Sequence, residues 1–470
     1  MKVLLIYPPV YNMLRTNVPK IVDEETGVYP PLGLMFIASY VEKNTDYKIE
    51  ILDTQIERMT YNEISKCIKL KMPDIVGIQT TTFTFIDVIL TARIVKKIDK
   101  NIKVVLGGPH VNIYPEETIL NPEIDFLVLG EGEFVFTELI NAIAQGKNLD
   151  KIRGIVYKKK GGIVNTESPE PINNLDLLPF PSRHLVPYKK YYSVLSKYTP
   201  IATMMTSRGC PFKCIFCDRP HLGKVFRFRS AENVVDEMEE CVKIGIKEFF
   251  LYDDTFTINR KRVVEICDEI LRRKLKIAWD IRSRVDTVDK NMLRKLRLAG
   301  CERIHYGVEA GTQIILKVLK KGITIQQIEN AFRWTKEEGI TTLAYFMIGN
   351  PTETKEQILT TIDLAKKINP DFVHISITTP FPATELYREG LKRGILKYDY
   401  WRDFSQNPRK DFVPEFWEEN LTREELVKLS SYAYRSFYIR PTYLLKRVFE
   451  IESWREFYRK AKAGFKLFKI

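Results

Sequence analysis

Short apolar runs and longer amphipathic segments alternate along most of the chain. In the first 150 residues the runs are rich in β-branched residues and predict strands at Lys2–Tyr7, Lys48–Asp53, Asp74–Thr80, Lys103–Leu106 and Asp125–Leu129. Between them, apolar residues recur at helical spacing, which predicts helices at Leu34–Glu42, Tyr61–Leu70, Phe85–Ile98 and Phe134–Ala144. Strands that alternate with helices predict an α/β fold with a Rossmann-like, doubly wound parallel sheet.

A second alternation of the same kind begins near Ile201. The expected strands are Ile201–Thr206, Glu248–Tyr252, Lys276–Ile281, Arg303–Val308, Thr342–Ile348 and Phe372–Thr378. The expected helices are Ala231–Val242, Arg260–Arg273, Lys290–Ala299, Ile325–Glu337 and Glu356–Ile368. These strands are fewer than the eight of a closed barrel, so the sequence predicts a partial (β/α)6 barrel that is open on one side.

These patterns divide the chain into a domain at 1–150, a hairpin and linker at 151–195, a barrel at 196–395 and a helical region at 396–470. Gly154–Asn165 is typical of a hairpin that turns at Gly161-Gly162, and the proline-bearing Asp176–Arg183 of a connector. The aromatic stretch Tyr432–Pro441 predicts either the core of a helical cap or a contact with substrate or a membrane surface. A basic, aromatic helix is expected at Trp454–Phe468.

Composition indicates a packed globular protein, because 44% of its 470 residues are hydrophobic and 28% are charged. The net charge is +13, and the segment from Leu421 to Ile470 holds 12 Lys and Arg against 5 Glu. Such an excess favours nucleic acid, an anionic membrane or acidic substrates, or reflects only a lysine-rich composition. No apolar run approaches the roughly 18 residues of a membrane span, and Pro8-Pro9 interrupt the first run too early for a signal peptide. We expect a cytoplasmic protein, with contact at a membrane surface as a further option.

The strongest chemical signal is a group of three cysteines, Cys210, Cys214 and Cys217, in a loop-like stretch. Three thiolates at this spacing suit three corners of a cubane iron–sulfur cluster and leave the fourth iron open to a ligand from outside the protein. The alternative is zinc, which takes four protein ligands in a structural site; His221 would then be the fourth. The remaining cysteines stand in apolar patterns and are expected to be small buried hydrophobes: Cys67, Cys241, Cys267 and Cys301.

Small, polar and glycine residues gather where the predicted strands end. Ligands bind at the carboxyl ends of parallel strands, so these residues are candidates for binding. In the first domain they are Thr80, Thr81, Gly107, Gly108, His110, Gly130 and Glu131. In the barrel they are Asp253, Asp254, Arg284, Glu309, Gly349 and Pro351. A nicotinamide dinucleotide is disfavoured, because no Gly-x-Gly-x-x-Gly follows the first strand. His110 is expected to lie in a loop that faces a ligand edge or solvent.

The cysteine motif, with Phe216 before its last cysteine, resembles the signature of radical S-adenosylmethionine enzymes. The resemblance implies that the amine and carboxylate of S-adenosylmethionine chelate the open iron of a [4Fe–4S] cluster, and that one electron cleaves the sulfonium to a 5′-deoxyadenosyl radical. It implies that Asp253 or Asp254 binds the amine and ribose and that Arg284 binds the carboxylate. Gly349–Thr354 resembles the turn that supports adenine in that family.

The first domain resembles the cobalamin-binding domain that precedes many such barrels. The resemblance rests on Pro8-Pro9, Pro31-Leu32-Gly33-Leu34, Thr80–Thr82, Gly107-Gly108-Pro109-His110 and Gly130-Glu131-Gly132-Glu133. The Asp-x-His-x-x-Gly loop that ligates cobalt from below is replaced by Pro8–Asn12. The resemblance therefore implies cobalamin without a histidine ligand from that loop.

A segment at Phe437-Tyr438-Ile439-Arg440-Pro441 resembles the branch that contains anaerobic magnesium-protoporphyrin cyclase and hopanoid-modifying enzymes. This resemblance implies methylation of an unactivated carbon in a hydrophobic or lipid-like substrate, with flavodoxin or ferredoxin as reductant. One alternative is radical oxidation or cyclisation with cobalamin as electron mediator. Another is a cobalamin-binding or redox-sensing regulator without turnover. Nucleic acid is disfavoured, because the tail lacks the alternating strands of the tRNA-modifying relatives.

Overall fold

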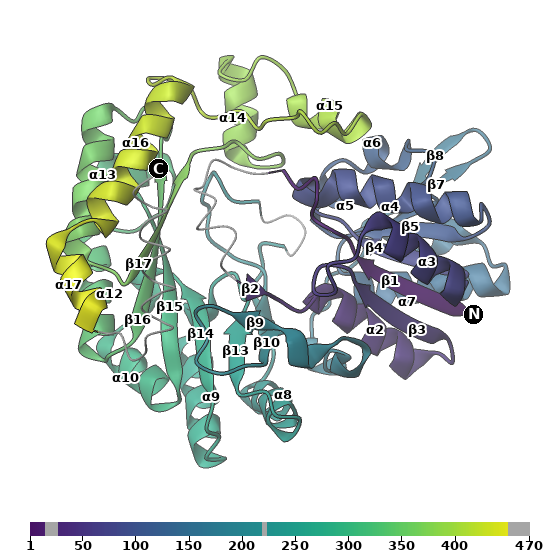
Figure 1. Cartoon of the computed structure of the whole chain (residues 1–470), viewed down its shortest axis with the longest axis horizontal. Coiled ribbons are helices and arrows are strands. Elements are labelled where there is room, and N and C mark those ends of the chain that lie inside the picture. The colour runs from purple at the N-terminus through teal and green to yellow at the C-terminus, as the bar shows by residue number, and fades with distance from the viewer. Residues whose placement is uncertain (15–26, 219–222, 450–470) are drawn as a thin grey trace.

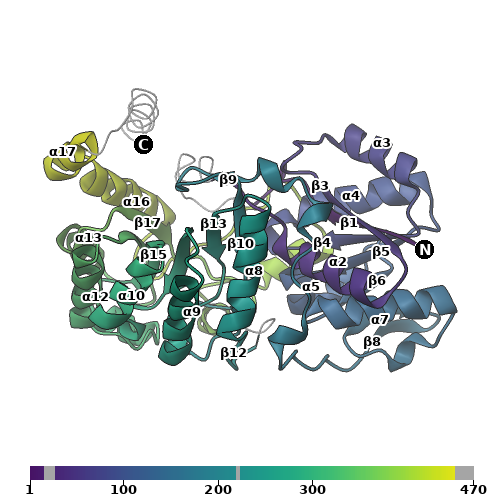
Figure 2. The ribbon, with the colours of Figure 1, turned by 90° about the horizontal axis from the view of Figure 1, so that it is seen from below.

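A computed structural model describes residues 1–14, 27–218 and 223–449. Two α/β parts lie side by side, and the helices at residues 423–449 lie at the far end of the second part (Figure 1 and Figure 2). None of the helices in these ranges is long and apolar enough to cross a membrane. His221 and the helix expected at Trp454–Phe468 lie outside the described residues.

The amino-terminal part is built on a sheet with the strand order β3-β1-β4-β5-β6-β7-β8. Its parallel strands are β1 (Lys2–Tyr7), β3 (Lys48–Asp53), β4 (Ile75–Gln79), β5 (Lys103–Gly107) and β6 (Phe126–Val128). The chain order of these strands reverses between β1 and β4, as in doubly wound sheets of the flavodoxin type. The expected Rossmann-like fold is confirmed, and the reversal marks the point where such sheets bind ligands.

Helices cover both faces of this sheet. The helices α2 (Leu32–Asn44) and α7 (Gly132–Gln145) pack on one face, through Val41 and Leu139 among others. The helices α3 (Tyr61–Lys71) and α4 (Phe85–Ile98) pack on the other, with α5 (Pro109–Ile113) and α6 (Pro115–Ile119) nearby. The apolar sequence periodicity therefore corresponds to two buried layers.

The hairpin at residues 155–165 belongs to this sheet and not to a linker. β7 (Ile155–Lys159) pairs antiparallel with β6, and β8 (Gly162–Asn165) pairs with β7. The hairpin prediction is confirmed, but its expected place in the linker is wrong. Hydrogen bonds to the edge of β6 decide this, and the sequence pattern carries no information about such a partner.

The second part is a partial barrel whose strands follow one another in chain order, all parallel. They are β10 (Ile201–Met204), β13 (Glu248–Leu251), β14 (Ala278–Ser283), β15 (Cys301–Glu309), β16 (Thr341–Ile348) and β17 (Phe372–Ile377). The outer helices are α8 (Ala231–Lys243), α9 (Arg260–Arg272), α10 (Lys290–Leu298), α11 (Gln313–Val318), α12 (Ile325–Glu337) and α13 (Lys355–Ile368). The predicted open (β/α)6 barrel is confirmed.

The helix α16 (Arg423–Tyr438) closes the free edge of β17. The hydroxyl of Tyr434 accepts from the Ile375 amide at 2.9 Å and donates to the Ile375 carbonyl at 3.2 Å. Tyr438 makes the same pair of bonds with Val373, both at 3.0 Å. These tyrosines satisfy backbone groups that an edge strand would leave open. This part of the aromatic stretch therefore forms the core of a cap; the short helix α17 (Pro441–Phe449) follows it.

Two short helices after the barrel return to the first domain. These are α14 (Glu385–Arg393) and α15 (Tyr400–Gln406), which Figure 1 shows reaching toward α6. Trp401 and Phe404 are fully buried in the same core as Phe85 of α4. This segment therefore ties the barrel to the first domain.

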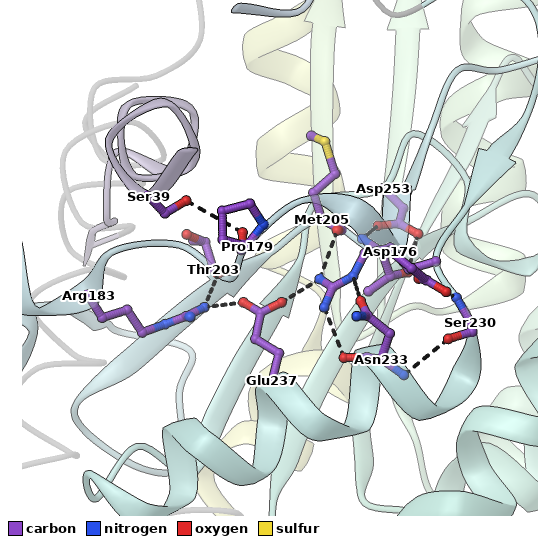
Figure 3. Close-up of polar contacts among 12 residues, drawn as sticks. Ser39, Asp176, Pro179, Arg183, Thr203, Met205, Ser230, Asn233, Glu237 and Asp253 are labelled. Carbon is purple, nitrogen blue, oxygen red and sulfur yellow. Dashed lines mark hydrogen bonds and ion pairs between the residues drawn. The ribbon is translucent and has the colours of Figure 1, made fainter. Parts of the chain in front are cut away.

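Buried ion pairs hold the connector to the barrel (Figure 3). Glu237 of α8 accepts from Arg183 of the connector and from Arg229, which precedes α8. Arg183 also donates to the Thr203 carbonyl of β10 at 3.3 Å. All three charged side chains are at most 9% exposed. The connector is therefore held against the barrel by a charge-paired core.

Candidate functional site

A cavity of about 460 Å³ opens at the carboxyl edge of the first sheet. Its floor includes Leu5, Gly77 and Val105, and its rim includes Gly107, Gly108, Gly130 and Glu131. Met205, Arg208 and Tyr252 reach it from the barrel side. The cavity thus lies at the reversal of strand order and is completed by the second domain.

Glycine is required at Gly108 of the rim. Its φ is +115°, and a Cβ there would lie 2.6 Å from the carbonyl oxygen of Thr80. Thr80 and Thr81 do not line the cavity: Thr80 is fully buried, and Thr81 bonds to Thr84 at the start of a turn. Thr80 therefore supports the rim from behind.

Gln79 offers the cavity a free polar group. Its Oε1 atom is buried and has no hydrogen-bond partner among the described residues, and the side chain lines the cavity. A buried amide oxygen without a partner is costly in an empty protein. The apolar floor and this one acceptor fit the flat, amide-bearing organic part of a cobalamin.

His110 lies away from the cavity, in the core. It is fully buried on α5, with its ring 4.0 Å from that of Phe85 and its Nδ1 3.1 Å from the Thr82 hydroxyl. Burial lowers its pKa to about 3. The expectation of a loop residue facing ligand or solvent is wrong, because Pro109 begins a helix that turns the imidazole inward.

The cysteine loop follows β10 and a short strand, β11 (Ser207–Arg208). Cys214 is buried, Cys210 is half-buried and Cys217 is exposed. The Ile215 amide donates to the Leu319 carbonyl at 3.2 Å, and the Ile215 carbonyl accepts from the Leu386 amide at 2.9 Å. Barrel backbone therefore anchors the middle of the loop.

Within the described ranges, no three His, Cys, Asp or Glu side chains are grouped to hold a single metal ion. A cubane cluster places no such demand, because each thiolate binds a different iron at a different corner. The thiolate donor set of the loop fits such a cluster. Burial, with added effects of the charges on Asp254 and Cys214, raises the pKa of Cys210. Iron must then displace that thiol proton.

Arg284 supports the cysteine loop. Its guanidinium lies 3.7 Å from the Phe212 ring and donates to the Lys321 carbonyl at 2.7 Å and toward the Cys214 sulfur at 3.9 Å. It is also paired with Asp286 at 2.9 Å. The expected role as a carboxylate clamp is not supported by these contacts, because they already occupy the guanidinium.

Glu309 is likewise engaged within the protein. Its carboxylate accepts from Lys321 at 2.7 Å, and both side chains are almost fully buried. The residue sits where the β15–β16 register shifts, with a φ of 71°. The positive φ and the register shift place Glu309 at an irregular strand end, and its role in binding a cofactor stays a prediction.

Asp253 and Asp254 differ in environment. Asp253 is fully buried and accepts from the Thr206 amide and hydroxyl, both at 2.6 Å, and from the Ser207 hydroxyl. It fixes the segment that enters the cysteine loop. Asp254 is exposed, and its pKa is raised, first by desolvation and then by the charge of Asp253. The sequence left both acids open, and only Asp254 is free to meet a ligand.

Gly349 packs against the cap. Its φ is +74°, and a Cβ there would lie 2.6 Å from a methyl group of Leu426 on α16. The next residue but one, Pro351, is buried. Contact with α16 explains this glycine; support of adenine remains a prediction for the turn as a whole.

Glu353 of that turn titrates near neutral pH. Burial raises its pKa to about 7, although Asn350 donates to its Oε2. Because the folded pKa lies above that of an exposed glutamate, stability from the protonated form is complete below about pH 4.5 and is lost as the pH rises through 7.

Glu353→Gln is therefore expected to remove a loss of stability of about 1.4 kcal/mol per pH unit between about pH 4.5 and 7. Urea unfolding of cofactor-free protein at pH 5, 6, 7 and 8 measures the difference, which should level off above pH 7. Parallel pH profiles for the two proteins would contradict the titration.

The sequence analysis missed an ionic joint between the domains. Arg208 pairs with Glu131 at 2.6 Å and with Glu133 at 2.5 Å, and Arg227 pairs with Glu131 at 2.7 Å. All of these side chains are nearly fully buried. Glu131, which was expected to bind cofactor, is thus both a rim residue and a partner of two arginines. The sequence features that could have indicated these ion pairs are the acidic residues Glu131 and Glu133 in the first domain, and Arg208 and Arg227 on either side of the cysteine loop.

Comparisons with known proteins agree with this geometry. A Radical SAM superfamily model matches residues 204–365, and a B12 binding domain model matches residues 19–140. A protein of Pyrococcus horikoshii described as an uncharacterized methyltransferase is 39% identical, over 96% of this chain and 95% of its own. The chain belongs to the cobalamin-binding radical S-adenosylmethionine enzymes.

Further relatives fit this radical enzyme family. Anaerobic magnesium-protoporphyrin IX monomethyl ester cyclase of Rubrivivax gelatinosus is 31% identical, over 90% of this chain and 76% of the relative. The fold matches the cobalamin-dependent S-adenosylmethionine radical enzyme OxsB with aqua-cobalamin and S-adenosylmethionine bound. The TM-score is 0.75 at 20% identity, over 99% of this chain and 72% of that one. The cofactors of this enzyme are a [4Fe–4S] cluster, S-adenosylmethionine and cobalamin.

Proposed function

We propose that this radical enzyme transfers a methyl group to an unactivated carbon of a largely apolar substrate. One observation carries the proposal: the end of β13 connects the two cofactor sites. Tyr252 lines the cavity of the first domain, and Asp254, two residues later, lies close enough to Cys210 to affect its pKa. When bound, the cluster supplies an electron for radical formation and cobalamin supplies a methyl group. The Pyrococcus relative, described as a methyltransferase, supports the same choice.

The sites are proposed as follows. Cys210, Cys214 and Cys217 hold the cluster, and Asp254 binds the amine or ribose of S-adenosylmethionine. Cobalamin occupies the cavity behind Gly107, Gly108, Gly130 and Gln79. The division of the chain at about residues 150, 195 and 395 remains part of this proposal, with the hairpin reassigned to the first sheet.

The proposal is tested by product analysis. Holoenzyme, a low-potential reductant, S-adenosylmethionine and an extract of a strain lacking the gene are incubated under anaerobic conditions. Methyl transfer predicts both 5′-deoxyadenosine and S-adenosylhomocysteine. Formation of 5′-deoxyadenosine alone, in response to the extract, would favour radical oxidation or cyclisation, the second candidate, which the cyclase relative supports.

Gly107→Leu is expected to prevent cobalamin binding and leave the cluster intact. Gly107 lines the cavity, its φ is not in the left-handed region, and a Cβ there meets only Val128, at 3.8 Å. A larger side chain is therefore compatible with the backbone but occupies ligand space. The visible absorption of cobalamin after gel filtration, together with iron content, measures the effect. Retained cobalamin would place its site elsewhere.

We also propose partners and location. A flavodoxin or ferredoxin supplies the electron in the cytoplasm. Peripheral membrane contact is proposed for α17, where Leu444 and Leu445 are exposed. Flotation of the enzyme with anionic vesicles, compared with a chain that ends at Arg440, tests this contact.

A further inference from the structure

The inner wall of the barrel carries ionisable side chains. Residues that point outward, such as Ile304 and Ile375, are buried against the helices. Successive side chains of a strand alternate between the two faces, so the residues between them point inward. On the middle strands these inward residues are Asp280, Arg282, Arg303, His305, Tyr345 and His374. The strand register sets Arg282 beside His305 and Tyr345 beside His374.

Most of these groups are engaged with one another. The ring of His305 lies between two partners, with Nδ1 3.1 Å from the Tyr345 hydroxyl and Nε2 3.3 Å from an Asp280 oxygen. The same carboxylate lies 3.8 Å from the Arg303 guanidinium. The Tyr345 and His374 rings are 5.4 Å apart. The negative charge of Asp280 is therefore balanced within the wall.

Arg282 has no such balance. Its side chain is exposed, and its guanidinium lies 4.7 Å from the Tyr252 ring. It makes no ion pair or hydrogen bond within residues 1–14, 27–218 and 223–449. Desolvation and the charge of Asp253 raise the pKa of Asp254, the charge of Arg282 lowers it, and Arg282 and Asp254 form no ion pair. Its neighbours Arg284 and Arg303 are both paired.

Arg282 lies between the two proposed cofactor sites. Tyr252, on which the guanidinium rests, lines the cobalamin cavity, and Asp254 adjoins the cysteine loop. The inner wall also presents Leu343 and Phe372. A molecule held there would meet these apolar side chains and the guanidinium of Arg282, which is unpaired within the described part of the chain.

We propose that Arg282 binds a carboxylate or phosphate group of the substrate, so that the substrate is an apolar molecule with an anionic end. A planar guanidinium offers two parallel donors to either group. This proposal rests on the proposed function, because its assay measures the products of radical methyl transfer. The methionyl carboxylate of S-adenosylmethionine is also an anion that Arg282 could bind, because Arg284, the other candidate for that carboxylate, is already paired. The test therefore distinguishes an anionic group of the substrate from the carboxylate of the cofactor.

The test uses fractions of an extract from a strain lacking the gene, separated on an anion-exchange resin at neutral pH. Each fraction is added to holoenzyme with reductant and S-adenosylmethionine, and both S-adenosylhomocysteine and 5′-deoxyadenosine are measured. The stimulating compound is expected in the resin-bound fraction. Arg282→Gln should need about tenfold more of that fraction for half-maximal rate. Arg282→Lys, which keeps the charge without the fork, should lie between.

Arg333→Gln is the matched control. Arg333 is also an arginine beside an aromatic ring, 6.0 Å from Trp334, but it lies on the outer helix α12. Its response to the fraction should equal that of the unmodified enzyme. Iron and cobalamin contents show whether each variant holds its cofactors. If Arg282→Gln loses them, Arg282→Lys is compared with Arg333→Gln instead.

The anionic substrate is overturned if the stimulating compound passes through the resin, or if Arg282→Gln and Arg333→Gln respond alike. An increase only in the S-adenosylmethionine concentration needed would assign Arg282 to the cofactor, which also overturns it. A bound fraction that raises 5′-deoxyadenosine without S-adenosylhomocysteine would refute methyl transfer and leave the anionic substrate standing.

Discussion

Cys214→Ala is expected to leave the enzyme without its iron–sulfur cluster and unable to cleave S-adenosylmethionine. Cys214 is the buried member of the loop and the one that Arg284 approaches. With two remaining thiolates, the loop cannot occupy three corners of a cubane. Anaerobically reconstituted wild-type enzyme should hold about four irons per chain, and the variant almost none. Formation of 5′-deoxyadenosine should fall to background.

Cys267→Ala is the control for this experiment. Cys267 is fully buried on α9, among apolar residues and outside the loop. The same substitution there should leave both the iron content and S-adenosylmethionine cleavage unchanged. One tightly bound zinc in the wild-type enzyme, or a full complement of iron in the Cys214 variant, would refute the cluster assignment.

Glu237→Gln is expected to destabilise the enzyme by about 3–5 kcal/mol, because it leaves two buried arginines without their shared anion. Burial alone would raise the pKa of Glu237, but the charges of Arg229 and Arg183 outweigh it and hold the pKa low. A lowered pKa means that the stabilisation is present above the pKa of an exposed glutamate and is lost as the pH falls through the folded value. Urea unfolding of cofactor-free protein near pH 7 measures the loss.

Glu239→Gln is the matched control on the same helix. The Glu239 side chain is 38% exposed and pairs with Lys243 and Arg273. Exposed pairs contribute about 0–1 kcal/mol, so this variant should differ little from the wild type. Equal destabilisation by the two substitutions would mean that the buried pairs of Figure 3 do not hold the connector to the barrel.

Local patterns predicted most of the architecture. The strands at Lys2–Tyr7 and Lys48–Asp53 and the helix at Phe85–Ile98 have the predicted bounds. The order of apolar segments along the barrel also matches its strands. These features depend on the spacing of apolar residues within a few turns or pleats, and the sequence contains that spacing in full. The cysteine loop is local in the same sense, since its ligands lie within eight residues.

The spacing of apolar residues could not predict contacts between segments that are distant in the sequence. His110 and Gly349 were chosen for their place after a strand, yet one packs on Phe85 and the other on Leu426. Arg284 was expected to hold a ligand, and the folded chain uses it to support Cys214. A residue type limits which bonds a side chain makes, but its neighbours decide which of them form.

The sequence by itself determined two α/β units, a cysteine loop for a cluster and a family, because periodicity and short motifs are properties of adjacent residues. Only the tertiary structure decided which residues remain free for ligands. Asp253 and Asp254 adjoin in sequence, but hydrogen bonds from Thr206 and Ser207 occupy the first and leave the second open. The sequence analysis did not single out Arg282. It stands out only because the barrel sets it between the two proposed cofactor sites, with no paired acid among the residues that the structure describes.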